Sequence, residues 1–193
     1  MIESFGTIVK EGTTLIIRPF DNDDAVQIAH LLNCYLPFEE ENEETIKKAE
    51  GIRYVCEDKG QIIGYIAGIT LSNSYDEMPY HQLELQALHD KAAHYKTIYT
   101  THLVVHPDYR GAGIGCQLVD AYMTEVKKQA QLLIVVGWVK SDSGRWDAER
   151  LFTKVGLKSF CYISRYFEAY NVYCPNCSGV CYCDAHIHWL EIA

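Results

Sequence analysis

The sequence of 193 residues contains no apolar run near the roughly 20 residues that a membrane-spanning helix requires. Its first residues, "MIESFGTIVKEG", lack a basic start followed by an apolar block, so we predict no signal peptide and expect a cytoplasmic protein that does not contact membranes. Lysine and arginine are scarce, at 17 against 26 acidic residues, which gives a net charge of −9. This balance disfavours a nucleic-acid surface, and it mildly favours a cationic substrate.

Internal repeats and low-complexity linkers are also missing, so we expect a single domain over residues 1–193. Hydrophobic residues make up 48% of the chain, which is enough to build a core. Residue patterns predict strands over 13–20, 52–57, 61–70, 97–105, 132–139, 158–167 and 185–192. They predict helices after Asp21, around 85–95, over 113–129 and over 147–155, with a charged helix or loop over 38–50. This order indicates one mixed α/β domain.

A glycine-rich segment, "VVHPDYRGAGIGCQLV" at 104–119, joins a predicted strand to a predicted helix. Its glycines permit unusual backbone conformations and leave no Cβ in the way of a ligand. The first N–H groups of a helix have no partner within the helix, and with the helix dipole they attract phosphate groups. Arg110 adds a fixed positive charge. The segment therefore predicts a diphosphate site, the alternative being a tight turn without a ligand.

Two common diphosphate-binding loops do not fit this segment. A P-loop ends in Gly-Lys-Ser/Thr, and "GIGCQ" has neither lysine nor a hydroxyl residue. A dinucleotide-binding loop has the spacing G-x-G-x-x-G in the first strand–helix turn, whereas the spacing here is G-x-G-x-G, late in the chain. The string V-H-P-D-Y-R-G-A-G-I-G instead resembles the acyl-CoA loop of the GNAT superfamily of N-acyltransferases, V-x-P-x-x-R-G-x-G-I/L-G.

Two further segments extend this resemblance over about Thr13 to Phe167. "RWDAERLFTKVGL" at 145–157 is similar to the family's second motif, N-x-x-A-x-x-L-Y-x-x-x-G-F, and "LIIRPF" resembles its first strand. The resemblance implies a central mixed, mostly antiparallel sheet flanked by helices, with acetyl-CoA as co-substrate.

The resemblance also implies where acetyl-CoA binds. The diphosphate would lie on the backbone N–H groups of the glycine loop, and the pantetheine would pair with the strand at 101–105. Backbone N–H groups near 103–105 would stabilise the oxyanion. The expected cofactor-binding residues are Leu103, Val104, Val105, Arg110, Gly111, Ala112, Gly113, Ile114, Gly115 and Cys116. Cys116 could also be a nucleophile, but the family's mechanism needs no covalent cysteine, so we expect it to pack beside the cofactor.

The reaction implied is direct attack of an amine on the thioester, which needs a general base because an alkyl ammonium is almost wholly protonated at pH 7. His102, on the strand that would flank the thioester, is the first candidate. The alternative is a hydrogen-bonded structural histidine. Asp142 and Glu84 are weaker candidates, for which solvation or helix capping is the alternative.

The second motif departs from the family pattern at two positions. Many members have a tyrosine that can protonate the leaving thiolate, and this chain has Phe152 there. Arg145 stands where an asparagine is common. Water, Tyr162 or Tyr166 would then have to supply the proton.

Two segments are candidates for binding the acceptor. "FEEENEET" at 38–45 has five glutamates, which could receive a polyamine, an aminoglycoside or a lysine-rich peptide, or form a solvated helix face. The long connection at 71–97 is typical of a lid or binding element. Its alternative is a helix that makes the contact of a homodimer.

Four cysteines near the end of the chain, Cys174, Cys177, Cys181 and Cys183, lie within ten residues of one another. In a reducing compartment such cysteines are thiols or metal ligands more often than disulfides. We predict a metal-binding loop over 170–188, in which the four cysteines hold a structural zinc, with His186 or His188 able to replace one of them. A redox dithiol, a disulfide and plain thiols are the alternatives, since only three residues separate the two cysteine pairs.

Together these features predict an N-acetyltransferase that moves an acetyl group from acetyl-CoA to a primary amine of a small cationic molecule or a protein. The alternative is a non-catalytic protein on a degenerate GNAT fold, either an acyl-CoA-binding regulator or a zinc-stapled interaction module. Acetylation of charged tRNA is disfavoured by the net charge of −9.

Overall fold

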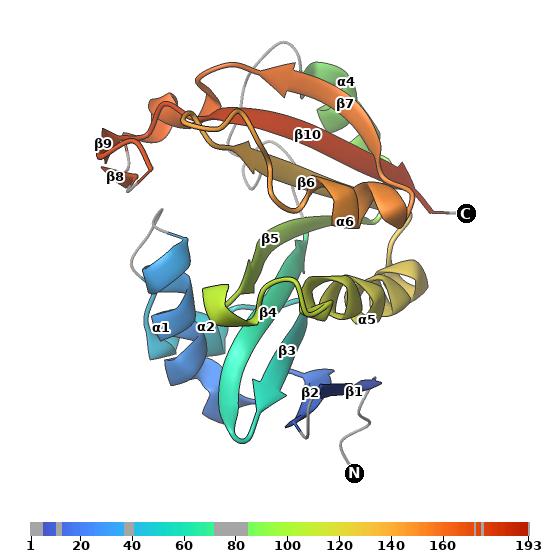
Figure 1. Ribbon diagram of the computed structural model, residues 1–193. Coiled ribbons are helices and arrows are strands. Elements are labelled where there is room, and N and C mark those ends of the chain that lie inside the picture. The colour runs from blue at the N-terminus through green and yellow to red at the C-terminus, as the bar shows by residue number, and fades with distance from the viewer. Residues whose placement is uncertain are drawn as a thin grey trace.

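The main feature of the computed structural model is an eight-stranded sheet with the strand order β1-β2-β3-β4-β5-β6-β10-β7 (Figure 1). The structure describes residues 6–10, 13–36, 41–71, 85–171, 173–174 and 176–192. The strands of the sheet are β1 (Gly6–Lys10), β2 (Thr13–Pro19), β3 (Ile52–Asp58), β4 (Gln61–Thr70), β5 (Thr97–Val105), β6 (Leu132–Val139), β7 (Lys158–Ile163) and β10 (Asp184–Glu191). A separate hairpin consists of β8 (Tyr173–Cys174) and β9 (Gly179–Val180).

Helices cover both faces of this sheet. The α-helices are α1 (Ala25–Tyr35), α2 (Glu43–Lys48), α4 (Gln86–Ala92), α5 (Ile114–Gln129) and α6 (Glu149–Lys154). One face packs against α5 and α6, and the other packs against α1 and α2 at one end and α4 at the other. All neighbouring strands of the sheet pair antiparallel except β5 and β6, which are parallel. The predicted mixed, mostly antiparallel α/β fold is therefore confirmed.

Local sequence accounts for several of these boundaries. Lys59 and Gly60 have φ angles of 51° and 84°, the paired positive values of a tight hairpin turn, and they join β3 to β4. Asp21 accepts the N–H of Asp23 and begins a short 3₁₀ helix, Asn22–Asp24, that continues into α1. No described helix is long and apolar enough to cross a membrane.

The structure differs from the predicted elements at both ends of the chain. Strand β1 was not predicted, and it forms a hairpin with β2 at the edge of the sheet. The strand expected over 158–167 ends at Ile163. The chain turns there, because the Ser164 hydroxyl and the Arg165 N–H both donate hydrogen bonds to the carboxylate of Asp184. A 3₁₀ helix at Tyr166–Tyr170 follows.

The middle of the sheet splits where β5 leaves β6. The parallel pairing of these strands ends at Thr100 with Val135. On the opposite edge of β5, Ala67 pairs with His102 and Gly68 pairs with Thr100, so Thr101 is an extra residue, a β-bulge. A bulge bends its strand and increases the local twist. The remainder of β5 therefore diverges from β6, as Figure 1 shows, and leaves a gap between two neighbouring strands.

Candidate functional site

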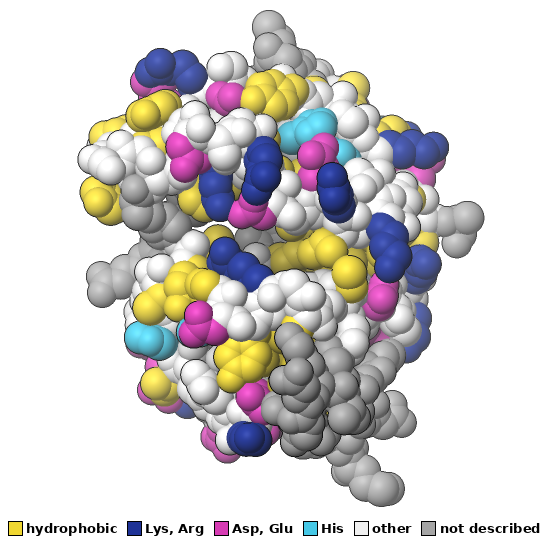
Figure 2. Space-filling model, viewed as in Figure 1, with side chains coloured by type: hydrophobic (Ala, Val, Ile, Leu, Met, Phe, Trp, Pro, Cys, Tyr) yellow, Lys and Arg dark blue, Asp and Glu magenta, His cyan; other side chains and the backbone are white. Residues whose placement is uncertain are grey.

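A cavity of about 1010 Å³ occupies the gap between β5 and β6. Its walls include Leu103 and Phe152, which pack with α5 and α6, and also Leu32 and Tyr35 of α1 on the opposite face. The cavity thus passes through the sheet and connects its two faces. Figure 2 shows a hollow between the two halves of the molecule, with Lys and Arg side chains at its edges.

The glycine loop forms one end of this cavity. Gly111 and Gly113 have φ angles of 78° and 84°, which only glycine adopts without strain, and Gly113 is the residue before the first turn of α5. No hydrogen bond joins the backbone N–H groups of residues 111–116 to any other described residue. The space where a Cβ of Gly111 or Gly113 would lie is empty to 4 Å. Six consecutive amides without a hydrogen-bond partner among the described residues, leading into a 16-residue helix, are suited to binding an anion.

The strand that leads into the loop exposes part of its backbone to the cavity. The N–H of His106 donates to the carbonyl of Ile63 on β4 at 2.8 Å. Backbone groups of alternate residues point to opposite edges of a strand, so those of Leu103 and Val105 point away from β4 and towards the gap. The Val105 carbonyl accepts a hydrogen bond from Nε of Arg110 at 3.0 Å. Of the ten predicted cofactor residues, all but Ala112 line the cavity.

His102 lies in the wall of the same cavity, on the α1 face. Its Nδ1 is 3.1 Å from the hydroxyl of Thr101. Burial lowers the pKa of His102, and the charge of Glu41 opposes this shift only in part. The ring is therefore neutral at pH 7 and can accept a proton. Asp142 is exposed in the turn after β6 and does not line the cavity, and Glu84 lies outside the described residues.

Phe152, at the position where many family members have a tyrosine, belongs to an aromatic wall of the cavity. Phe152 is buried, lines the cavity, and stacks on Trp146 with ring centroids 5.6 Å apart. Trp146 lies over Gly137 of β6 so closely that a Cβ there would be 2.2 Å from the indole. Tyr162 is exposed and bonded to Asp184, and Tyr166 is fully buried. Neither tyrosine lines the cavity, so the expectation that one of them replaces the missing phenol is not supported.

Four basic side chains surround the end of the cavity near the glycine loop. They are Arg110, Lys140, Arg145 and Arg150. Asp147 pairs with Lys140 at 2.6 Å and with Arg145 at 3.7 Å, whereas Arg150 has no ion-pair partner among the described residues. Of these four residues, the sequence predicted only Arg110 to bind the cofactor. The other three lie in the β6–α6 connection and in α6, some 30 to 40 residues further along the chain. A basic rim is suited to the phosphates of a nucleotide cofactor.

At the opposite end the cavity wall comes from α1 and the residues that follow it. Residues 38–40 of the acidic segment at 38–45 lie outside the described residues, and among residues 41–45 only Glu41 lines the cavity. Glu43 and Glu44 pair with Lys47 and Lys48 along α2, at 2.5 Å each, and do not line the cavity. Most of the connection predicted as a lid, residues 72–84, lies outside the described residues.

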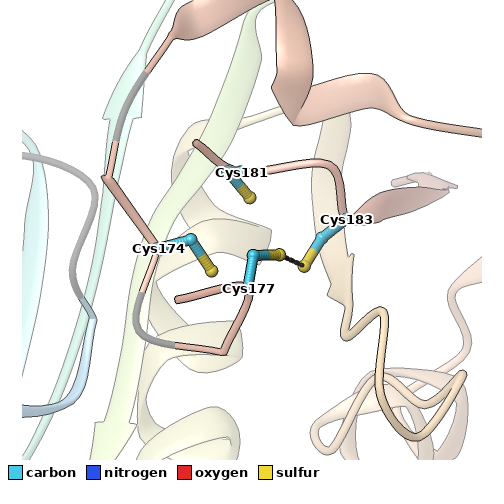
Figure 3. Close-up of side chains that lie close together, drawn as sticks. All are labelled: Cys174, Cys177, Cys181 and Cys183. Carbon is cyan, nitrogen blue, oxygen red and sulfur yellow. Dashed lines mark hydrogen bonds between the residues drawn. The ribbon is translucent and has the colours of Figure 1, made fainter. Parts of the chain in front are cut away.

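The structure brings the four predicted metal-ligating cysteines together and separates them from the histidines. The sulfurs of Cys174, Cys177, Cys181 and Cys183 all lie within 4.8 Å of one another. Figure 3 shows these four side chains gathered in one cluster. His186 and His188 are neighbours on β10, with ring centroids 4.2 Å apart. They face Glu149 of α6, whose carboxylate is 3.1 Å from Nδ1 of His186.

Comparisons with known proteins agree with this geometry. The family "Acetyltransferase (GNAT) domain" matches residues 49–158, and the chain belongs to this family. No curated protein sequence matches the chain. Its fold is similar to that of an N-acetyltransferase from Staphylococcus aureus Mu50, with a TM-score of 0.65 at 15% identity over 93% of this chain and 99% of that one.

Two further solved structures have the same fold. The ribosomal-protein-S18-alanine N-acetyltransferase from Escherichia coli has a TM-score of 0.62 at 17% identity, over 93% of this chain and 94% of that one. The yncA protein of Salmonella typhimurium, solved with its cofactor acetyl-CoA, has a TM-score of 0.64 at 14% identity over the same shares of the two chains. Membership of this family supports an acyltransferase, and the solved structures support the fold.

Proposed function

We propose that the protein transfers the acetyl group of acetyl-CoA to a primary amine, in a complex that holds both substrates at once. The observation that carries this proposal is the run of six free amides at residues 111–116, opening into a cavity that crosses the sheet. Family membership and the acetyl-CoA bound to the Salmonella protein support the same cofactor. The diphosphate would accept hydrogen bonds from these amides, with the basic rim neutralising its charge.

In this proposal the reaction takes place where β5 leaves β6. The pantetheine would lie along Leu103 and Val105, whose backbone groups face the gap, and an N–H there would stabilise the oxyanion. His102 would accept the proton of the attacking amine, because it is neutral and lies on the α1 face of the cavity. Phe152 cannot donate a proton, and a thiolate is a good leaving group, so water would protonate the departing CoA.

The acceptor would enter from the face opposite to the glycine loop. That end of the cavity is lined by Leu32, Tyr35 and Leu36 of α1 and its C-terminal end, and by Glu41. An apolar wall with one carboxylate fits an amine with an aliphatic or aromatic body and a positive charge. Small cationic amines and the amino groups of peptides both have this chemistry.

The first test is turnover of acetyl-CoA against polyamines, aminoglycosides, amino acids and peptides, measured as release of the CoA thiol. We expect at least one amine to give turnover, and Gly113→Glu to lower kcat/KM by about 100-fold or more, since a charged side chain would cover the free amides. Binding of acetyl-CoA without thiol release from any of the amines would instead favour the non-catalytic alternative.

Gly60→Glu is the matched control for backbone strain. Gly60 has the same φ of 84°, and a Cβ there also meets nothing within 4 Å, but it lies in the β3–β4 turn outside the cavity. Both variants carry a similar cost of about 1–2 kcal/mol for a side chain at positive φ. If Gly113→Glu retained full activity, or if both variants lost activity equally, the glycine loop would not be the cofactor site.

A further inference from the structure

We propose that Cys174, Cys177, Cys181 and Cys183 bind one zinc ion through four thiolates, and that this centre holds one wall of the substrate cavity in place. Zinc bound to four cysteines is tetrahedral with Zn–S distances near 2.3 Å, which places the sulfurs about 3.8 Å apart. The four sulfurs lie within 4.8 Å of one another, and those of Cys177 and Cys183 are 3.5 Å apart. Figure 3 shows all four side chains directed towards a common centre.

The backbone around the cysteines is arranged as metal-binding turns. The β8–β9 hairpin pairs Cys174 with Gly179, which returns the chain after the first cysteine pair and brings the second pair against it. The N–H of Cys177 donates to the carbonyl of Cys174 at 3.1 Å. The hydroxyl of Ser141 lies 3.3 Å from the sulfur of Cys177 and can donate a hydrogen bond to it. A donor directed at sulfur is an outer contact that orients and stabilises a thiolate ligand.

The described residues of the segment 171–183 bury little apolar surface besides the cysteines. Among them, the fully buried side chains are those of Cys174, Cys181 and Cys183. The larger apolar side chains described in this segment face solvent, with Tyr173, Val180 and Tyr182 each about half exposed or more. A short segment that buries so little apolar surface needs a metal or a disulfide to offset its loss of chain entropy.

The centre contacts the substrate cavity through three groups. Trp138 of β6 and Phe167 pack against the cysteine cluster, and both line the cavity. The N–H of Phe167 donates to the carbonyl of Cys183 at 3.3 Å. The hydroxyl of Ser141, next to the cavity-lining Lys140, lies 3.3 Å from the sulfur of Cys177. Four protein ligands leave no open position for a substrate, so the role is structural.

Binding is an acid–base step without oxidation or reduction, in which each thiol releases its proton to solvent and forms a bond to Zn²⁺. Metal analysis of the purified full chain should give one zinc per chain. Replacement by Co²⁺ should give the visible spectrum of a tetrahedral thiolate complex. Neither readout depends on acetyl transfer, so these experiments can confirm or refute the zinc site separately from the proposed function. Only the effect on the cavity wall rests on that function.

Matched variants identify the ligands. Cys177→Ser should lose the zinc, whereas Cys34→Ser, an exposed cysteine on α1, should keep it. The double variant His186→Asn with His188→Asn should also keep it, because these rings face Glu149. If Cys177→Ser fails to fold, the metal content and Co²⁺ spectrum of the unaltered chain still decide. Four free thiols without metal, a disulfide within the cluster, or zinc lost from the histidine variant would overturn the assignment.

Hydrogen exchange tests the link to the cavity. Removing the zinc with a chelator should increase exchange at the amide of Phe167 and leave the amides of α5 protected. Unchanged exchange at Phe167 after zinc loss would refute the proposed support of the cavity wall.

Discussion

His102 shows how much of a side chain's role depends on its surroundings. The GNAT resemblance made His102, on the strand that would flank the thioester, the first candidate for the general base, with a structural histidine as the alternative. The ring lines the cavity, its hydrogen-bonding neighbour is Thr101, and burial lowers its pKa below 6.5. A base with a lowered pKa is unprotonated at neutral pH, so it loses function only when the pH falls through that lowered value.

His102→Gln should therefore lower kcat by about 100-fold to 10,000-fold at pH 7.5. In the unaltered enzyme kcat should fall in acid with a midpoint below pH 6.5, and this acid limb should be missing from the variant's profile. The measurement is a pH–rate profile at saturating amine and acetyl-CoA. His94→Gln, which changes an exposed ring outside the cavity, should behave like the unaltered enzyme. If His102→Gln kept the full kcat, His102 would be a structural histidine and not the general base.

Other single residues could not be placed from the sequence alone. Among 14 tyrosines no pattern distinguished Tyr162 and Tyr166 from the rest, and the structure places one against Asp184 and buries the other. The cysteines were predicted as a group because their spacing is local. The histidines three and five residues after Cys183 could not be separated from the cysteines by sequence, since only the register of β10 directs His186 and His188 towards α6.

At the scale of elements, strands and long helices followed from their periodicity, whereas the gap between β5 and β6 did not. The bulge at Thr101 has no marker in "TIYTTHLVV", because it depends on how β4 and β6 pair with the two edges of this strand. The short helix α6 was predicted, but its role in the wall was missed. Trp146, just before α6, reaches the cavity only because Gly137 on β6 leaves room for its indole.

Gly137→Ala tests this contact. The added Cβ would be 2.2 Å from the indole, so Trp146 must move away from Phe152 and the cavity wall. We expect a loss of about 1–3 kcal/mol in the free energy of unfolding and a higher KM for acetyl-CoA. Chemical denaturation and initial rates would measure the two effects. Gly179→Ala adds the same methyl group where nothing lies within 4 Å, and should change neither quantity. Equal stability of the two variants would show that this packing does not hold the wall.

At the scale of the whole molecule, charge is distributed unevenly. The chain carries a net charge of −9, yet four basic side chains gather where the cavity opens beside the glycine loop. The net charge disfavours a nucleic-acid surface, but it could not show this local basic rim. The rim is assembled from residues 110 to 150, which only the fold places together.

Arg150→Glu should raise KM for acetyl-CoA by about tenfold and leave kcat unchanged, because Arg150, like Arg110, has no ion-pair partner among the described residues and can pair with a phosphate. KM should also rise with ionic strength, and less steeply in the variant. Lys128→Glu makes the same charge change on the exposed end of α5, outside the cavity. A similar rise in KM in both variants would mean that overall charge matters and the rim does not.

Because the cavity crosses the sheet, it would give acetyl-CoA and the amine separate entrances in the proposed reaction. A nucleotide held by the start of α5 and an amine arriving past α1 would meet only in the interior, so neither needs to move for the other to come or go. Free CoA and the acetylated amine would then depart through separate exits and in either order, and the limit on acceptor size would be set by the α1 side alone.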